Sequence, residues 1–463
     1  MSKIFKDVRT YFMVLLFLDI AWLLYQVLRY PILPMKYMIL FMIILIAIIV
    51  LLVLSQYLAK SKKTKIIGKV FIILLCLILI PVNYTYSKTM NALNKMVATE
   101  EKDVVSVIVK KNRSYEYIED LKGKTFSTLA TNDTNVDKTL KKIEKSYGET
   151  INPKNYYGVI TLVNALYYNE VDCIVINESY RSVIEEEYEN FSEETKVIYF
   201  ENYTTYLKDP KNKDITKESF SVYISGIDTY GAISTKSRSD VNMIVTVNPT
   251  KKRILLTSIP RDYYIPFNVL NGEKDKLTHS GLYGVNETKD NVAKYFGIDI
   301  DYFVRVNFDS VIDIVNALGG IDVHNPRAFG NFNEGLIHLN GEQALSFSRE
   351  RHAFAEGDKE RGRNQMRVIT GIIDKAMSPA IITGYMDLLN SLHSSFQTDL
   401  SDEQMISFVR MQIDDMSTWD IQSISVDGTG NSLYSPIYGS NLYMMVPDDN
   451  SVEVAKNRIK ELY

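Results

Sequence analysis

The chain has 463 residues, of which 46% are hydrophobic and 23% are charged, and its formal net charge is −4 at pH 7. This length exceeds one ordinary domain, and the slightly acidic balance excludes the basic character that general nucleic-acid binding requires. Hydrophobic residues are concentrated near the N-terminus, which indicates membrane spans ahead of folded domains.

Three apolar stretches approach the length of about 20 residues that a helix needs to cross a bilayer. They are residues 11–28, 37–59 and 66–82. The first contains Asp19 and the third contains Lys69, so two spans is the alternative reading. Lys69 lies near the start of its stretch, where its stem can reach the interface. We expect three transmembrane helices over residues 11–82.

Basic residues are distributed unevenly around these spans. They precede the first span and crowd the loop between the second and the third: Lys3, Lys6 and Arg9, then Lys60, Lys62, Lys63 and Lys65. The positive-inside rule therefore predicts a cytoplasmic tail at residues 1–10 and an extracellular location for the chain after about residue 83. Cys173 is the one cysteine of the exported part, which fits a Gram-positive-like cell membrane.

The first exported segment, residues 103–213, alternates predicted strands and helices. The strands are 104–109, 125–129 and 171–176, and the helices are 136–147, 159–168 and 178–188. This pattern predicts a small α/β accessory domain. Parts of it resemble a lobe of a solute-binding protein, but a spacer or docking role without a ligand is the simpler interpretation. The polar run at 208–214 marks its end.

A second α/β domain is predicted over residues 219–463. Its strands are 219–227, 241–247, 253–259 and 302–308, and its helices are 286–296, 310–318 and 361–377. This alternation predicts an α/β/α sandwich around a central mixed sheet.

Arginines and carboxylates cluster at the ends of these predicted elements. They lie in residues 237–240, 259–262, 348–351 and 361–365. If residues 346–351 are extended, Arg349 and Arg351 project to the same side, and a helix places Arg361 and Gln365 on one face. Isolated arginines are usually solvated surface. Planar donors clustered on rigid elements instead favour binding of a diphosphate. Because these motifs all follow residue 219, we expect the accessory domain to be dispensable for chemistry.

Nine blocks of the second domain resemble, in order, the LytR-CpsA-Psr family. They are residues 226–228, 238–240, 255–262 (LLTSIPRD), 276–279, 304–308 (VRVNF), 317–320, 339–345 (LNGEQAL), 349 with 351, and 361–365. Three spans followed by an accessory domain resemble the capsule-associated, CpsA-like branch of this family. Departures from the family pattern are small: Glu356 stands where Asp is frequent, and Gly284-Val285 where Gly-Gly is common.

The resemblance implies a glycopolymer phosphotransferase. Such an enzyme moves a polymer, here expected to be capsular polysaccharide, from an undecaprenyl-diphosphate carrier to peptidoglycan through a phosphodiester. The expected partners are this lipid-linked glycopolymer, the peptidoglycan acceptor, membrane lipid and other capsule-assembly proteins, with no nucleic acid. A diphosphate requires cationic donors and a divalent cation, Mg²⁺ or Mn²⁺.

The site residues follow from the matched blocks. The catalytic candidates are Arg261, Arg349, Arg351 and Asp240. The diphosphate-binding candidates are Arg238, Lys276, Arg305, Arg361, Arg363, Gln365 and Asp358, and the metal candidates are Asp228 and Asp240. The role of Asp358 stays open, because this residue could support either the metal or Arg361. No catalytic base is assigned, because His279 and His352 are interpreted as structural or surface residues, and phosphoryl transfer depends chiefly on positioning and charge.

Two other functions remain as alternatives: a membrane regulator of capsule or exopolysaccharide synthesis, and a non-catalytic polyprenyl-phosphate-binding protein. Direct DNA regulation is disfavoured, because the expected cytoplasmic segments are too short to fold as a helix-turn-helix. A carrier needs the same arginines as an enzyme. Turnover of a diphosphate lipid with Mg²⁺ distinguishes these two.

Overall fold

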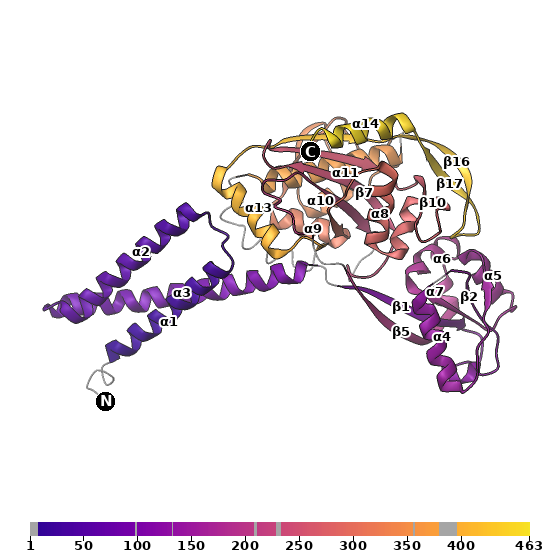
Figure 1. Cartoon of the computed structure of the whole chain (residues 1–463), viewed down its shortest axis with the longest axis horizontal. Coiled ribbons are helices and arrows are strands. Elements are labelled where there is room, and N and C mark those ends of the chain that lie inside the picture. The colour runs from indigo at the N-terminus through magenta and orange to yellow at the C-terminus, as the bar shows by residue number, and fades with distance from the viewer. Residues whose placement is uncertain are drawn as a thin grey trace.

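A computed structural model describes most of the chain. The described residues are 8–97, 100–131, 133–207, 211–227, 233–354, 357–378 and 396–463. Figure 1 shows long N-terminal helices extending from one end of the C-terminal domain, and the accessory domain lying near the other end.

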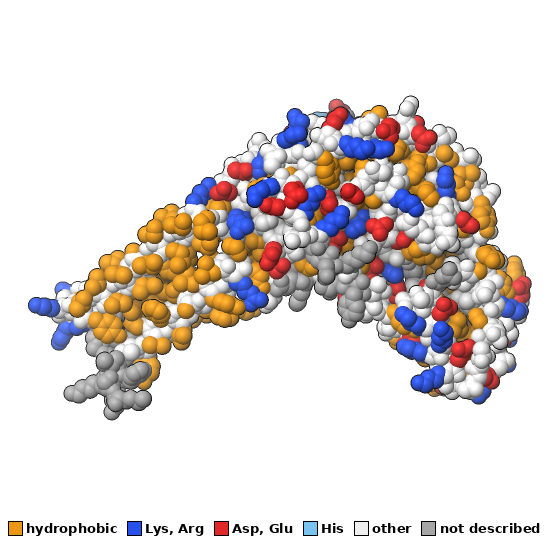
Figure 2. All heavy atoms as spheres, viewed as in Figure 1, with side chains coloured by type: hydrophobic (Ala, Val, Ile, Leu, Met, Phe, Trp, Pro, Cys, Tyr) orange, Lys and Arg blue, Asp and Glu red, His pale blue; other side chains and the backbone are white. Residues whose placement is uncertain are grey.

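The three apolar helices are α1 (Val8–Arg29), α2 (Met35–Val53, continued by a π-helical turn over Leu54–Leu58) and α3 (Lys62–Met96). Each contains a segment long and apolar enough to cross a membrane, and Figure 2 shows hydrophobic side chains covering their surface. Asp19 is accommodated among them because the Asn83 amide donates to its carboxylate at 2.6 Å. The helix α3 has 35 residues and continues well beyond the predicted end of the third span.

The accessory domain contains a five-stranded sheet in the order β3-β2-β4-β1-β5. The strands are β1 (Glu100–Lys110), β2 (Phe126–Leu129), β3 (Lys154–Tyr156), β4 (Cys173–Asn177) and β5 (Thr195–Tyr206). The helices are α4 (Thr134–Tyr147), α5 (Val159–Tyr167), α6 (Arg181–Glu187) and α7 (Phe191–Glu194), with short 3-10 turns η3 (Ile118–Leu121) and η4 (Glu178–Tyr180). Asp133 caps α4 by accepting from two backbone N–H groups, and Gly148 ends it in the left-handed conformation.

The C-terminal domain contains a six-stranded mixed sheet in the order β14-β11-β6-β7-β8-β15. The strands are β6 (Phe220–Ile227), β7 (Ser239–Asn248), β8 (Arg253–Ile259), β11 (Tyr302–Val306), β14 (Phe396–Thr398) and β15 (Asp420–Ser425). The pairs β11–β6 and β15–β8 are parallel, and the remaining pairs are antiparallel.

Helices cover both faces of this sheet, as the sequence predicts. Phe303 and Leu255 pack toward α8 (Val285–Phe296) and α14 (Asp449–Lys460). Val245 and Leu256 belong to the opposite layer, with α11 (Asp358–Ala376) and α13 (Asp402–Asp415). The remaining helices are η5 (Leu277–Tyr283), α9 (Phe308–Ala317) and α10 (Gly341–Arg349). Three two-stranded sheets complete the domain: β9 (Tyr264–Pro266) with β10 (Lys274–Lys276), β12 (Ile321–Asn325) with β13 (Gly335–Leu339), and β16 (Gly428–Ser435) with β17 (Ser440–Pro447).

The accessory and C-terminal domains share one hydrophobic core. Leu162 and Phe191 belong to the same buried cluster as Tyr263 and Tyr438. Burial of apolar surface between the two units makes each depend on the other for stability. Because of this shared core, the structure does not favour the expectation that the accessory domain is dispensable. The bounds of the accessory domain, 103–213, stay a prediction.

The C-terminal domain also contacts the ends of the apolar helices. Ile32, between α1 and α2, and Met90, in α3, lie in one cluster with Phe347 and Ile406. The Lys36 ammonium pairs with Asp414 of α13 at 2.9 Å. These contacts fix the domain against the end of the helical hairpin at which α1 ends and α2 begins.

A buried ion pair joins the two domains. Arg305 of β11 is 1% exposed, and its guanidinium pairs with the Glu101 carboxylate of β1. Removing one partner of a buried pair leaves an uncompensated charge, so Glu101→Ala is expected to lower the free energy of unfolding by about 3–5 kcal/mol. Chemical unfolding of the detergent-solubilised full chain, followed by circular dichroism, measures this change.

The control is Glu149→Ala, because Glu149 is an exposed acid of the same domain and surface substitutions usually change stability by no more than about 0.5 kcal/mol. Equal stability of the two variants would contradict the importance of the buried pair.

Candidate functional site

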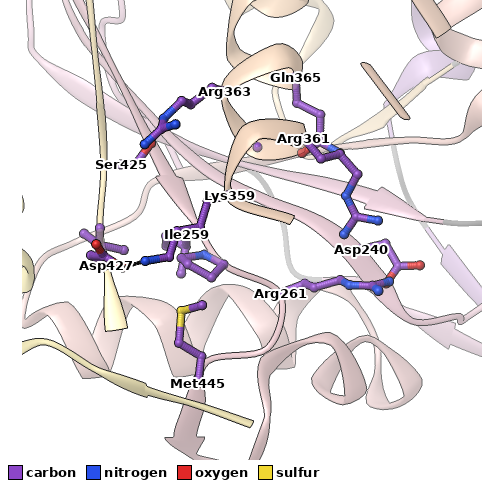
Figure 3. A pocket seen from close by; sticks show the side chains of 13 residues that line it. Asp240, Ile259, Arg261, Lys359, Arg361, Arg363, Gln365, Ser425, Asp427 and Met445 are labelled. Carbon is purple, nitrogen blue, oxygen red and sulfur yellow. Dashed lines mark hydrogen bonds and ion pairs between the residues drawn. The ribbon is translucent and has the colours of Figure 1, made fainter. Parts of the chain in front are cut away.

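A small polar pocket lies where β8 and β15 end and where β7 begins. Its volume is about 120 Å³. Asp240 enters from β7, Arg261 from the segment after β8, and Arg361 from the first turns of α11 (Figure 3). The full lining is Asp240, Ile259, Pro260, Arg261, Lys359, Arg361, Gly362, Arg363, Gln365, Ser425, Val426, Asp427 and Met445. The first turns of α11 therefore border a pocket that contains several cationic side chains.

Asp240 is the central carboxylate of this pocket. Its Oδ1 accepts from Arg261 Nη1 at 2.9 Å and from Thr278 Oγ1 at 3.0 Å. Burial alone would raise the pKa of Asp240, but the nearby charges of Arg261 and Arg238 outweigh it and hold the pKa below its usual value. Asp240 is therefore ionised at neutral pH.

The guanidinium groups of Arg261 and Arg361 approach Asp240 from two sides (Figure 3). Gln365 lies one helical turn after Arg361 and also lines the pocket. The sequence predicted this common face, and the structure brings these four residues together. Two arginines around one carboxylate leave net positive charge, which suits an anion with more than one charge.

A second group of charges lines the other side of the pocket. Lys359 pairs with Asp427 at 2.5 Å, and Arg363 pairs with Glu360 at 2.7 Å. Sequence reasoning missed Lys359, Asp427 and Ser425. Their signal is weak, because Ser425 and Asp427 follow a short strand and Lys359 precedes the matched block at 361–365.

Two further candidates lie beside the pocket rather than in its lining. Lys276 pairs with Asp262 at 3.2 Å, and Asp262 also lies 4.0 Å from Arg261. Arg238 pairs with Glu186 of the accessory helix α6 at 2.5 Å. Arg238 nevertheless acts on the pocket through its charge, because it contributes to lowering the pKa of Asp240.

The structure does not bring Arg305, Arg349 or Arg351 into the pocket. Arg305 is buried in the ion pair with Glu101. Arg349 is exposed and its guanidinium lies 4.1 Å from the centre of the Phe308 ring, and Arg351 contacts the neighbouring His352 at 3.2 Å.

The expected extended conformation of residues 346–351 is wrong, because α10 continues to Arg349. The Asn340–Gln343 capping box starts this helix.

Two of the remaining candidates, Asp228 and Asp358, are described only in part or not at all. Asp228 lies outside the described residues, and of Asp358 the structure describes only the backbone, at the first position of α11. His279 is buried, its Nδ1 lies 2.7 Å from Asp275, and its ring stacks on Tyr438. This environment agrees with the structural interpretation of His279.

The pocket fits a divalent cation whose other ligands come from a bound diphosphate. Asp240 Oδ2 is buried and accepts no hydrogen bond from the described residues. Mg²⁺ commonly takes one or two carboxylates together with substrate phosphates. Among the described residues, no cluster of three or more His, Cys, Asp or Glu forms an all-protein metal site.

A family model and several curated proteins match this chain. The LytR_cpsA_psr family model matches residues 174–461. The polyisoprenyl-teichoic acid–peptidoglycan teichoic acid transferase TagU of Bacillus cereus (strain AH820) is 34% identical over 236 residues, covering 50% of this chain and 75% of that protein. TagU of Bacillus licheniformis is 33% identical over 254 residues, covering 53% and 78%. Among solved structures, Bacillus subtilis TagV has a TM-score of 0.46 at 28% identity, covering 53% of this chain and 97% of that one. The chain belongs to the LytR-CpsA-Psr family.

Proposed function

We propose that the protein is a membrane-anchored transferase that moves a polyprenyl-diphosphate-linked cell-wall glycopolymer onto peptidoglycan. The observation that carries this proposal is the ionised, partly buried Asp240 between the guanidinium groups of Arg261 and Arg361. The TagU relatives support it, because they are named as transferases of teichoic acid from a polyisoprenyl carrier to peptidoglycan.

In the proposed reaction, a peptidoglycan hydroxyl oxygen bonds to the phosphorus that carries the glycan. The bridging P–O bond of the diphosphate breaks, polyprenyl monophosphate leaves, and the hydroxyl proton goes to solvent. Arg261 and Arg361 stabilise the charge that develops on the phosphate oxygens. Asp240 orients Arg261 through the 2.9 Å bond. Asp240 would hold a divalent cation together with the substrate phosphates, and such a cation would supply charge neutralisation when bound.

We also propose that the polymer is a capsular polysaccharide. The support is the combination of three apolar helices with an accessory domain ahead of the family domain. A direct comparison of a capsular-repeat donor with a teichoic-acid donor on the same polyprenyl diphosphate decides between the two polymers.

The central test uses the detergent-solubilised full chain with a polyprenyl-diphosphate glycan and measures release of polyprenyl monophosphate. Arg261→Ala and Arg361→Ala are each expected to lower turnover about ten- to a hundredfold, because a charge-assisted hydrogen bond contributes about 1.5–3 kcal/mol. Arg253→Ala is the matched control, because Arg253 lies at the opposite end of β8 and is exposed.

Parental turnover by both pocket variants would exclude this pocket as the diphosphate site. Arg349 and Arg351 stay predictions, and their alanine variants belong in the same series.

Asp240→Asn tests the carboxylate. We expect it to abolish turnover and, with it, the stimulation by Mg²⁺ or Mn²⁺. The folded-state pKa of Asp240 is lowered, so its contribution to stability is fully present above the ordinary aspartate pKa of about 3.9 and is lost as the pH falls through the lower folded value. The stability difference between parent and variant should therefore shrink in acid, which thermal unfolding at several pH values measures.

Full activity of Asp240→Asn, or parental activity after chelation of all divalent cations, would contradict the proposed role of Asp240.

We propose that both folded domains are extracellular. In intact cells, a membrane-impermeant maleimide is expected to label Thr235→Cys and to spare Ser61→Cys, which lies between α2 and α3. The natural Cys76 and Cys173 are both buried, so they should give little background labelling. Labelling of Ser61→Cys alone would reverse the topology and exclude a role at the cell wall.

A further inference from the structure

The β16–β17 hairpin connects the pocket with the accessory domain. Met445 of β17 lines the pocket, and its backbone N–H donates to the Asp262 carbonyl at 2.7 Å. At the other end, the Ile437 carbonyl accepts from Val159 N–H at 2.8 Å, and the Tyr438 hydroxyl donates to Glu186 at 2.9 Å. Both ends of the hairpin are therefore fixed, which makes it a rigid surface rather than a free loop.

One face of this hairpin continues outward from the pocket. Met445 and Tyr443 are two positions apart on β17 and so share a face. Ser432 pairs with Tyr443, and Tyr434 pairs with Asn441, so Tyr434 lies diagonally beside Tyr443 on that same face. Tyr443 and Tyr434 are 56% and 50% exposed. Two aromatic rings therefore extend the pocket wall into an open surface.

The strand opposite Tyr443 carries small residues. A Cβ atom at Gly430 would lie 2.6 Å from the Tyr443 ring, so the ring lies across the glycine backbone. Gly428 and Ser432 are on the same face of β16. The Tyr443 ring contacts the Gly430 backbone on one side and remains 56% exposed, so it is available for stacking.

The hairpin is uncharged. Neither β16 (GTGNSLYS) nor β17 (SNLYMMVP) contains an Asp, Glu, Lys or Arg, although 23% of the chain is charged. Its exposed polar groups are hydroxyls and amides, including Ser432 and Asn441. Such groups exchange hydrogen bonds with neutral hydroxyls and amides, whereas a phosphate-rich polymer would need cations.

We propose that the face formed by Tyr434, Tyr443, Ser432, Asn441 and Gly430 binds neutral sugar rings of the peptidoglycan acceptor strand. This inference rests on the proposed function. The pyranose C–H faces stack on the two tyrosines, and the sugar hydroxyl and acetamido groups bond to Ser432 and Asn441. The hairpin lies at the opposite end of the C-terminal domain from α1–α3 (Figure 1), so it faces away from the membrane that holds the lipid donor.

The binding test uses the detergent-solubilised full chain, purified peptidoglycan sacculi, and the soluble N-acetylglucosamine tetramer as a defined probe. The double variant Tyr434→Ala/Tyr443→Ala is expected to weaken binding to both about tenfold, because two stacking contacts are lost. Tyr443→Phe should retain binding, because it preserves the ring. Tyr168→Ala is the matched control, because Tyr168 is 74% exposed on the accessory domain.

Kinetics of transfer separate this proposal from the proposed function. The double variant is expected to raise the apparent KM for the acceptor about tenfold and to leave the KM for the lipid donor unchanged. Sacculus binding equal to the parent overturns the proposal. A raised donor KM with normal sacculus binding also overturns it, because the face would then hold the donor glycan. If the parent releases no polyprenyl monophosphate, the proposed function fails, while the sacculus and tetramer measurements still decide whether this face binds glycan.

Discussion

The ion pair between Glu101 and Arg305 is the contact on which the arrangement of the whole molecule depends. Arg305 is a cation inside the central sheet, and a buried cation is tolerated only with a carboxylate partner. That partner comes from β1, the first strand after the apolar helix α3. Glu101 also accepts from Val285 N–H at 3.1 Å, so the same carboxylate holds the start of α8. One residue of the accessory sheet thereby contacts both the C-terminal sheet and the start of α8.

The accessory domain takes part in the site more directly than a spacer would. Its Glu186 contacts both Arg238, whose charge acts on Asp240, and Tyr438, at the tip of the β16–β17 hairpin. The Glu186 side chain of α6 therefore holds Arg238, whose charge lowers the pKa of Asp240, and also holds the turn of the hairpin through Tyr438. The shared core of the two domains keeps this geometry fixed.

The sequence predicts well those features that depend on local pattern. Hydropathy places three apolar helices, and alternation finds most strands of the C-terminal sheet. Arg361 and Gln365 of the predicted block at 361–365 line one pocket with Asp240 and Arg261, because strand ends and a helix start meet at one edge of the sheet. Their role in binding stays a prediction.

The features that depend on distant contacts were not predictable in this way. Arg305 matches a family block, but its partner Glu101 lies 204 positions earlier. The β16–β17 hairpin contains Gly, Ser and Asn in place of alternating apolar residues, and its stability comes from contacts with Asp262 and the accessory domain. Arg349 belongs to α10, which starts at the Asn340–Gln343 capping box, so the expected extended R-x-R segment does not form.

The uninterrupted course of α3 has a mechanical consequence. Its 35 residues span about 52 Å at 1.5 Å per residue, whereas the hydrocarbon core of a bilayer is about 30 Å thick. The helix therefore extends beyond the hydrocarbon core, and it contains Pro81, a residue at which helices kink. Met90 near the C-terminal end of α3 packs against the C-terminal domain, so the length of α3 bears on how far this domain lies from the bilayer. A change in bilayer thickness or in helix tilt would therefore move the pocket and the β16–β17 hairpin together, because both belong to the C-terminal domain.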